Sequence, residues 1–218
     1  MKRGALCCAV ALSAAGFSST IVLAADSPAV GVTEMALGRS YADWNVEWAR
    51  FEWAPGGKDS PLLHPEGCRH KLVGRMFMLP GPAKSGLTIA CSIPAGASVF
   101  VPTASQIMTP SKGETPNRTT LSQRARIVFK QTKVLDVTLD GQKIAVRQFK
   151  STTPMFSIKA AKGSPFGYAG TWSAVQAGYN FILRPLPSGK HTLKMHVKIA
   201  QGGKTLYEAR TTFKLKAA

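Results

Sequence analysis

The chain has 218 residues, of which 44% are hydrophobic and 18% are charged, and its formal net charge is +17. This length accommodates one domain with a sizeable core. Beyond the N-terminus no apolar run approaches the length that crosses a bilayer, which excludes an integral membrane protein with helical spans.

Residues 1–25 have the pattern of a secretory signal peptide, with a charged start, an apolar centre and a small-residue exit. Val22 and Ala24 suit the −3 and −1 positions for cleavage after Ala24 or Ala25. The centre is too short and too rich in small residues for a membrane anchor. We therefore predict an exported protein, periplasmic or extracellular, whose mature chain is a single domain over residues 26–218.

Charge is distributed unevenly along the mature chain, whose net charge is +15 without Lys2 and Arg3. Residues 25–66 hold seven acids and three basic side chains, whereas residues 67–218 hold 23 basic side chains and four acids. Such a field attracts polyanions and weakens as salt is added. The candidates are anionic envelope polymers, lipid head groups and nucleic acid, although we do not expect specific nucleic-acid binding. A solvated surface without a partner is the alternative.

The stretch YADWNVEWARFEW predicts an amphipathic helix within residues 40–54, attached to the N-terminal side of the domain. Ser40 and Asp43 have the spacing of a capping box, and the Pro-Gly-Gly that follows ends the helix. Four aromatic side chains fall within about an 80° arc: Tyr41, Trp44, Trp48 and Phe51. We expect this arc to pack on the sheet, with Asp43, Glu47 and Arg50 on the opposite side. A partner-binding or sugar-stacking surface is the alternative.

Cys68 and Cys91 are the two cysteines of the mature chain. An even number in an exported protein predicts one disulfide, which would contribute ~3 kcal/mol in the chain-entropy model. A metal site that combines Cys68 with His64 and His70 is the alternative. Their spacing matches no zinc pattern, so we expect no metal.

Apolar, strand-like runs separated by Gly/Pro turns recur along the rest of the chain: residues 72–79, 87–93, 98–102 and 179–183. Residues 103–118 have the composition of a loop. A second short helix is predicted after it, with one apolar face: Leu121, Ala125, Val128 and Phe129. Many short strands of this kind predict a mainly β fold, an antiparallel β-sandwich that is Ig-like or jelly-roll-like.

Two hairpins can be predicted in register. Asp140-Gly141 is a type I′ turn signal, and it places the apolar residues on one face by pairing Leu139 with Gln142, Val137 with Ile144 and Leu135 with Val146. At the C-terminus, a loop of three or five residues around Gly202-Gly203 achieves the same by pairing Ile199 with Tyr207, Val197 with Ala209 and Leu193 with Phe213.

The C-terminal hairpin then has an apolar inner face and a basic outer face, with Glu208 opposite Lys198. Because the outer face gathers cations, its side chains are our candidates for ligand binding: Lys194, His196, Lys198, Arg210, Lys214 and Lys216.

Residues 160–178 have the composition of a long loop, in which Phe166, Tyr168 and Trp172 are spaced by glycines. Aromatic side chains on long loops often contact ligands, which makes these three an alternative site for a carbohydrate. Packing of the loop into the core is the other interpretation.

The order of the aromatic helix, a cysteine, the run CSIPAGASVFVP, the VTLDG hairpin and the run LRPLPSGKHTL resembles a family of secreted bacterial proteins. The most specific parts are C-x-I-P-A-G-x-x-x-F-x-P and PLPSGKHT. The resemblance covers nearly the whole mature chain. It implies export and a β-rich fold, and it supplies no activity.

The sequence contains no G-x-S-x-G elbow for a serine hydrolase, and both mature cysteines are expected to be bonded. A pair of glycosidase carboxylates would have to come from the acid-rich part: Asp43, Glu47, Glu52, Asp59 or Glu66. Glu47 flanks the aromatic arc and could mark a sugar site, whereas a solvated or salt-bridged helix face is the alternative.

We therefore predict a non-catalytic exported protein, without catalytic residues, cofactor or metal, that binds an anionic envelope component through the basic face. One alternative is a carbohydrate-binding or glycoside-hydrolysing protein that uses residues 160–178. The other is a structural subunit paired with another envelope protein.

Overall fold

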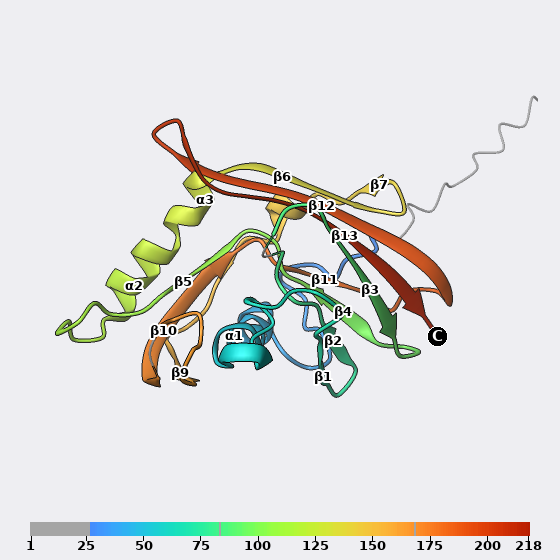
Figure 1. Cartoon of the computed structure of the whole chain (residues 1–218). Coiled ribbons are helices and arrows are strands. Elements are labelled where there is room, and N and C mark those ends of the chain that lie inside the picture. Colours follow the sequence, from blue (N-terminus) through green and yellow to red (C-terminus); the bar gives the residue numbers. More distant parts are fainter. Residues whose placement is uncertain (1–26, 83, 168) are drawn as a thin grey trace, which may run out of the picture.

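The computed structural model describes residues 27–82, 84–167 and 169–218, so the predicted signal peptide lies outside the described residues (Figure 1). The described chain is mainly β, as predicted, with one five-stranded sheet and two smaller sheets. None of the helices in these ranges has the length and apolar character that crossing a bilayer requires.

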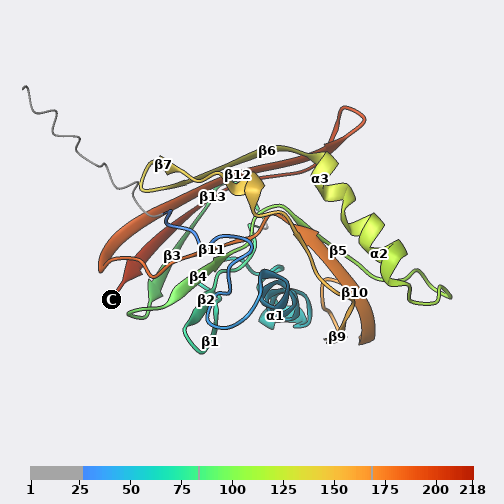
Figure 2. The same cartoon turned by 180° about the vertical axis from the view of Figure 1, so that it is seen from behind.

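The five-stranded sheet extends along one side of the molecule (Figures 1 and 2). Its strand order is β3 (Leu87–Ile93), β13 (Lys204–Ala217), β12 (Gly189–Gln201), β6 (Thr132–Leu139) and β7 (Gln142–Lys143). Neighbouring strands are antiparallel except β3 and β13, which are parallel, so the sheet is mixed. Leu193, Val197 and Phe213 point inward and are fully buried, which confirms the predicted apolar inner face.

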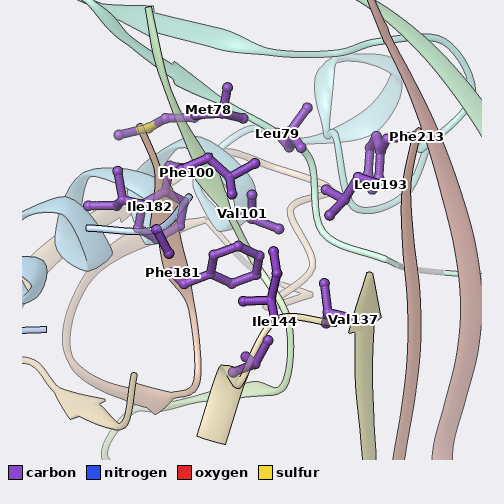
Figure 3. Close-up of a cluster of buried hydrophobic side chains, with 14 of the residues drawn as sticks. Met78, Leu79, Phe100, Val101, Val137, Ile144, Phe181, Ile182, Leu193 and Phe213 are labelled. Atoms are coloured by element: carbon purple, nitrogen blue, oxygen red, sulfur yellow. The ribbon is translucent and has the colours of Figure 1, made fainter. Parts of the chain in front are cut away.

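One of the smaller sheets, the central sheet, lies in the core with the strand order β1 (Lys71–Val73), β2 (Met76–Met78), β4 (Ser98–Val101) and β11 (Phe181–Leu183). Every residue of its last three strands is buried. Because neighbouring side chains point to opposite faces, both faces must be covered. Figure 3 shows side chains of this sheet packed against the inner face of the five-stranded sheet.

The predicted strand over residues 72–79 is in fact the β1–β2 hairpin. Val73 pairs with Met76, and Gly74 occupies the turn with a φ of 57°. A left-handed residue at this position reverses the chain, which the apolar run alone does not reveal. The pairing of β2 with β4 is parallel.

The third group of strands pairs around β10 (Gly170–Gly178), with β5 (Ser105–Met108), β8 (Ser151–Thr152) and β9 (Phe156–Ala160). Two expectations are corrected here: residues 103–118 contain β5, and most of the second half of the predicted 160–178 loop is β10. The second helix is present in two pieces, α2 (Arg118–Ala125) and α3 (Ile127–Gln131). Three of its predicted apolar residues are fully buried, and Phe129 is half-buried.

Helix α1 (Tyr41–Trp53) lies on the side away from the five-stranded sheet, between the β9–β10 and β1–β2 hairpins (Figures 1 and 2). Its capping box is present: the Ser40 hydroxyl accepts from the Asp43 N–H, and the Asp43 carboxylate accepts from the Ser40 N–H. The aromatic arc is buried apart from the half-buried Phe51. Trp48 stacks on Phe100 of the central sheet, which confirms that the arc packs inward.

Both predicted hairpins are present with local differences. Asp140 and Gly141 have φ angles of 51° and 83°, and Leu139 pairs with Gln142, but the returning strand ends at Lys143. A short 3-10 helix follows at Val146–Gln148, and another lies earlier in the chain at Gly57–Asp59. Val146 is buried without forming the predicted strand pair with Leu135.

The C-terminal hairpin has the predicted register, with Ile199 opposite Tyr207 and Leu193 opposite Phe213. The loop length is different from the prediction: Gln201 pairs with Lys204, which leaves a two-residue Gly202-Gly203 turn. A register shift after Ile199 absorbs the extra residue as a β-bulge and keeps the faces unmixed. The disulfide Cys68–Cys91 is confirmed and joins the segment before β1 to β3.

Candidate functional site

The outer face of the five-stranded sheet carries all six residues predicted to bind a ligand. They lie at alternate positions on β12 and β13, opposite in direction to the buried inner residues. Lys194, Lys214 and Lys216 are exposed, as is Arg210, whereas His196 and Lys198 are half-buried. The alternation of residues along β12 and β13 and the turn between these strands therefore place the candidate residues on one surface.

The acids of this face divide the six residues into two groups. Glu208 contacts three of them: its carboxylate lies 2.8 Å from His196 Nε2, 3.4 Å from Lys198 Nζ and 3.4 Å from Arg210 Nη2. The hydrogen bond with His196, with the nearby Lys198 and Arg210 charges, lowers the pKa of Glu208. These three residues therefore share one acid partner within the protein.

The two other acids at this surface are engaged as well. Asp136 pairs with Lys143 at 3.2 Å. Asp140, in the β6–β7 turn, bonds His191 Nδ1 at 2.7 Å and accepts from the Thr192 N–H at 2.7 Å. Although burial opposes the effect, these hydrogen bonds lower the pKa of Asp140, and the Asp140 carboxylate raises the pKa of His191.

Four lysines remain at one end of the outer face without an acid partner among the described residues, and we call them the lysine cluster: Lys190, Lys194, Lys214 and Lys216. Lys190 lies directly opposite Lys216 in the strand register. Like charges directly opposite each other destabilise a sheet, so this arrangement is a local electrostatic cost of the fold. Sequence analysis missed Lys190, although its alternation with Lys194 was readable.

The outer face is hollowed beside Lys194. This side chain lines one hollow of about 420 Å³ with His196 and Arg210, and a second of about 300 Å³ with Lys214 and the Asp140 turn. A row of threonines crosses the same region, since Thr88 pairs with Thr212 and Lys194 with both Thr212 and Thr138. Ammonium and hydroxyl groups side by side are donors suited to phosphate, sulfate or carboxylate oxygens.

The alternative aromatic site is only partly assembled. Phe166 is half-buried and packs against Trp53 of α1 with ring centroids 5.5 Å apart, and Tyr168 lies outside the described residues. Trp172 is half-buried and pairs with Ile158 in the β9–β10 hairpin. It lines a cleft of about 590 Å³ together with residues 110–114 and Pro116.

The acids considered for glycoside cleavage have separate environments. Glu47 is bound to Lys71 at 2.6 Å, with Arg39 at 3.7 Å, and the hydrogen bond from Lys71 lowers its pKa. This is the salt-bridged helix face of the alternative interpretation. Glu66 pairs with Lys84 at the surface. Glu52, by contrast, is completely buried at the end of α1, where burial raises the pKa of its carboxyl to about 8.

Cys68 and His70 of the alternative metal site are also engaged in other contacts. Cys68 is in the disulfide, and the His70 ring stacks on Phe77 with centroids 4.4 Å apart. Within the described ranges, no group of three or more His, Cys, Asp or Glu side chains is placed to hold a metal ion.

No protein-family model and no curated protein sequence matches the chain. Among solved structures, the chain is similar to the solution structure of Amebosin, with 10% sequence identity and a TM-score of 0.25. The match covers 66% of this chain and 97% of that one. A likeness this low carries no argument about fold or function.

Proposed function

We propose that this protein is an exported, non-catalytic binding protein whose basic sheet face binds an anionic component of the cell envelope. The ligand chemistry is a phosphate, sulfate or carboxylate group, carried either by a polymer or by a lipid head group. Export is supported by the N-terminal pattern of residues 1–25 and by the disulfide Cys68–Cys91, since disulfides persist in oxidising compartments.

The lysine cluster is the observation that supports this proposal. All three acids of the outer face are already occupied by other cations, so the charge of the cluster is not balanced within the described protein. An anionic ligand would relieve the repulsion between Lys190 and Lys216 while it gains charge-assisted hydrogen bonds from Lys194 and Lys214.

Binding of two probes tests the proposal: inorganic polyphosphate as the polymer, and vesicles that contain phosphatidylglycerol as the lipid source. The mature chain should bind at least one probe, and it should not bind vesicles of phosphatidylcholine alone. Lys194→Glu/Lys214→Glu should weaken binding at least tenfold, because two attractive contacts become repulsive. Binding to one probe only identifies the source of the anionic group.

A matched control separates the cluster from net charge. Lys159→Glu/Lys162→Glu changes the total charge by the same amount at two exposed positions on and beside β9, outside the five-stranded sheet. This variant should retain most of the affinity. Equal losses in the two double variants would show that charge alone attracts the probes and would overturn the proposed site.

A second candidate function, carbohydrate binding, is favoured by the cleft beside Trp172. Sugar rings stack on aromatic faces, and such contacts are nearly independent of salt, unlike binding to the lysine cluster. In a glycan binding screen, Trp172→Ala should abolish any salt-independent binding and leave polyphosphate binding unchanged. Glycan binding that survives this substitution would rule out the cleft.

A further inference from the structure

A further cavity, of about 390 Å³, lies away from the lysine cluster, where α1, β5, α3 and the tip of the C-terminal hairpin meet. We call it the Glu52 cavity. Its walls are largely apolar and aromatic, and include Trp48, Trp53, Ile199 and Tyr207. The exposed Leu206, in the bulged part of the hairpin, lies at its rim.

Glu52 lines this cavity although its side chain has no solvent-exposed surface. Its Oε1 accepts a hydrogen bond from the Gly81 N–H at 3.0 Å. Glycine permits this approach, because a Cβ on residue 81 would lie 2.8 Å from Oε1 and would displace the carboxylate. The second oxygen, Oε2, has no hydrogen-bond partner among the described residues.

Gln106 of β5 lines the same cavity and presents a second buried oxygen, Oε1, that has no partner in the described chain. A buried polar atom without a hydrogen bond costs about 1–3 kcal/mol, so native proteins keep few of them. Two residues that line one cavity and each keep such an oxygen mark a place where a group with several N–H donors would be stabilised.

The described lining of the Glu52 cavity contains one acid and no basic side chain, unlike the rest of the molecule. In a mature chain with 26 basic side chains, none of the described lining residues is a lysine, arginine or histidine. The segment 79–82, β5, α3 and β12 contribute no titratable side chain to the lining, and β13 contributes Tyr207 alone. Burial and the Glu52 charge raise the pKa of Tyr207, so its phenol stays neutral.

We propose that the Glu52 cavity binds a small amphiphilic cation, a primary ammonium on an apolar or aromatic body, with Glu52 as its counter-ion. The ammonium donates to Glu52 Oε2 and Gln106 Oε1, and the faces of Trp48, Trp53 and Tyr207 supply an apolar, electron-rich wall. The size of the cavity suits a small molecule rather than a protein surface. This site is independent of the lysine cluster.

Binding of such a cation is coupled to loss of the Glu52 proton. Burial raises the pKa of Glu52 to about 8, so the free cavity holds mainly the neutral acid near neutral pH. An ammonium stabilises the carboxylate, and the carboxyl proton passes to the buffer as the ion pair forms. As the pH is raised toward about 8, affinity should therefore increase about tenfold for each pH unit, and it should level off above that pH.

The test is isothermal titration calorimetry of the mature chain with 2-phenylethylammonium as the probe and 2-phenylethanol as its neutral isostere. We expect the ammonium to bind with release of about one proton near pH 6, measured from buffers of different ionisation enthalpy, and the alcohol to bind at least tenfold more weakly. Equal binding of the two, or ammonium binding without proton release, would show an apolar cavity only and overturn the proposal.

Variants assign the effect to Glu52. Glu52→Gln is isosteric with the neutral acid and should fold, but it should lose the pH dependence and at least tenfold in affinity at pH 8. The control Glu47→Gln removes an acid from the same helix and should bind as the wild type does. Leu206→Arg, at an exposed position of the rim, places a competing cation beside the cavity and should also weaken binding. Unchanged binding in Glu52→Gln or Leu206→Arg contradicts the assignment.

Discussion

Glu52 is a carboxyl group without a counter-ion among the described residues, held by one backbone N–H at the end of an aromatic helix. Its position was readable from the sequence. Glu52 follows Trp48 by four residues, and side chains four apart lie on the same face of a helix, about 40° from each other. The predicted aromatic arc does not include Glu52, because acids are rarely buried without a partner.

The buried carboxyl makes stability depend on pH. Burial raises the pKa of Glu52 in the folded protein to about 8, from an ordinary value of 4.5. The folded state therefore binds more protons than the unfolded state between these values, and stability falls as pH rises through this window. Glu52→Gln should remove this loss, which we expect to be roughly 3–5 kcal/mol.

Urea unfolding of the wild type and of Glu52→Gln at about pH 5 and about pH 9 measures this effect. The difference in unfolding free energy between the two proteins should shift in favour of the variant at the higher pH, since the contributions of all other titrating groups are the same in both. A difference that does not change with pH would mean that Glu52 ionises normally, and it would also remove the basis of the cation proposal.

At the scale of elements, the sequence predicted the helix and the turn whose structure depends on residues close together in the chain. Helix α1 has its cap, its aromatic periodicity and its Pro-Gly-Gly end within 20 residues, and the Asp140-Gly141 turn determines its own register. The alternation of Phe156, Ile158 and Ala160 was a comparable signal for β9, but the glycines after it indicated a loop. Glycines inside β10 are tolerated because its pairing with β5, β8 and β9 compensates for them.

The docking of α1 depends on one tryptophan more than on another. Trp48 is buried, stacks on Phe100 and donates its Nε1–H to the Leu79 carbonyl at 3.0 Å, whereas Trp53 is half-buried near the end of the helix. Trp48→Ala should cost about 3–5 kcal/mol of unfolding free energy, from lost burial and an unpaired carbonyl. Trp53→Ala should cost clearly less. Equal losses in urea unfolding would contradict this packing.

At the scale of the whole molecule, the order of strands was beyond local patterns. The parallel pairing of β3 with β13 joins segments that are more than 100 residues apart, and nothing in either strand identifies the other. The predicted inner and outer faces are nevertheless correct, because the turn geometry and the alternation of apolar and polar residues agree in the C-terminal hairpin. The lysine cluster could be foreseen as positive residues on one face, but the division made by Glu208 required the side-chain contacts.

The disulfide adds to a core that is already extensive. Cys68 and Cys91 are 23 residues apart, for which the chain-entropy model gives about 3 kcal/mol. Cys68→Ser/Cys91→Ser should therefore lower the unfolding free energy by about this amount and keep a cooperative transition. Loss of cooperative unfolding in this variant would show that the core of the two packed sheets does not fold without the bridge.

The central claim is that anions bind the molecule at one end of the outer sheet face, and the salt dependence of polyphosphate affinity tests it most directly. For the wild type and for Lys159→Glu/Lys162→Glu, affinity should fall at least tenfold between about 50 and about 200 mM NaCl. For Lys194→Glu/Lys214→Glu, both the affinity and its salt dependence should be strongly reduced. Polyphosphate affinity that does not depend on salt, or the same salt dependence in both double variants, would contradict the account.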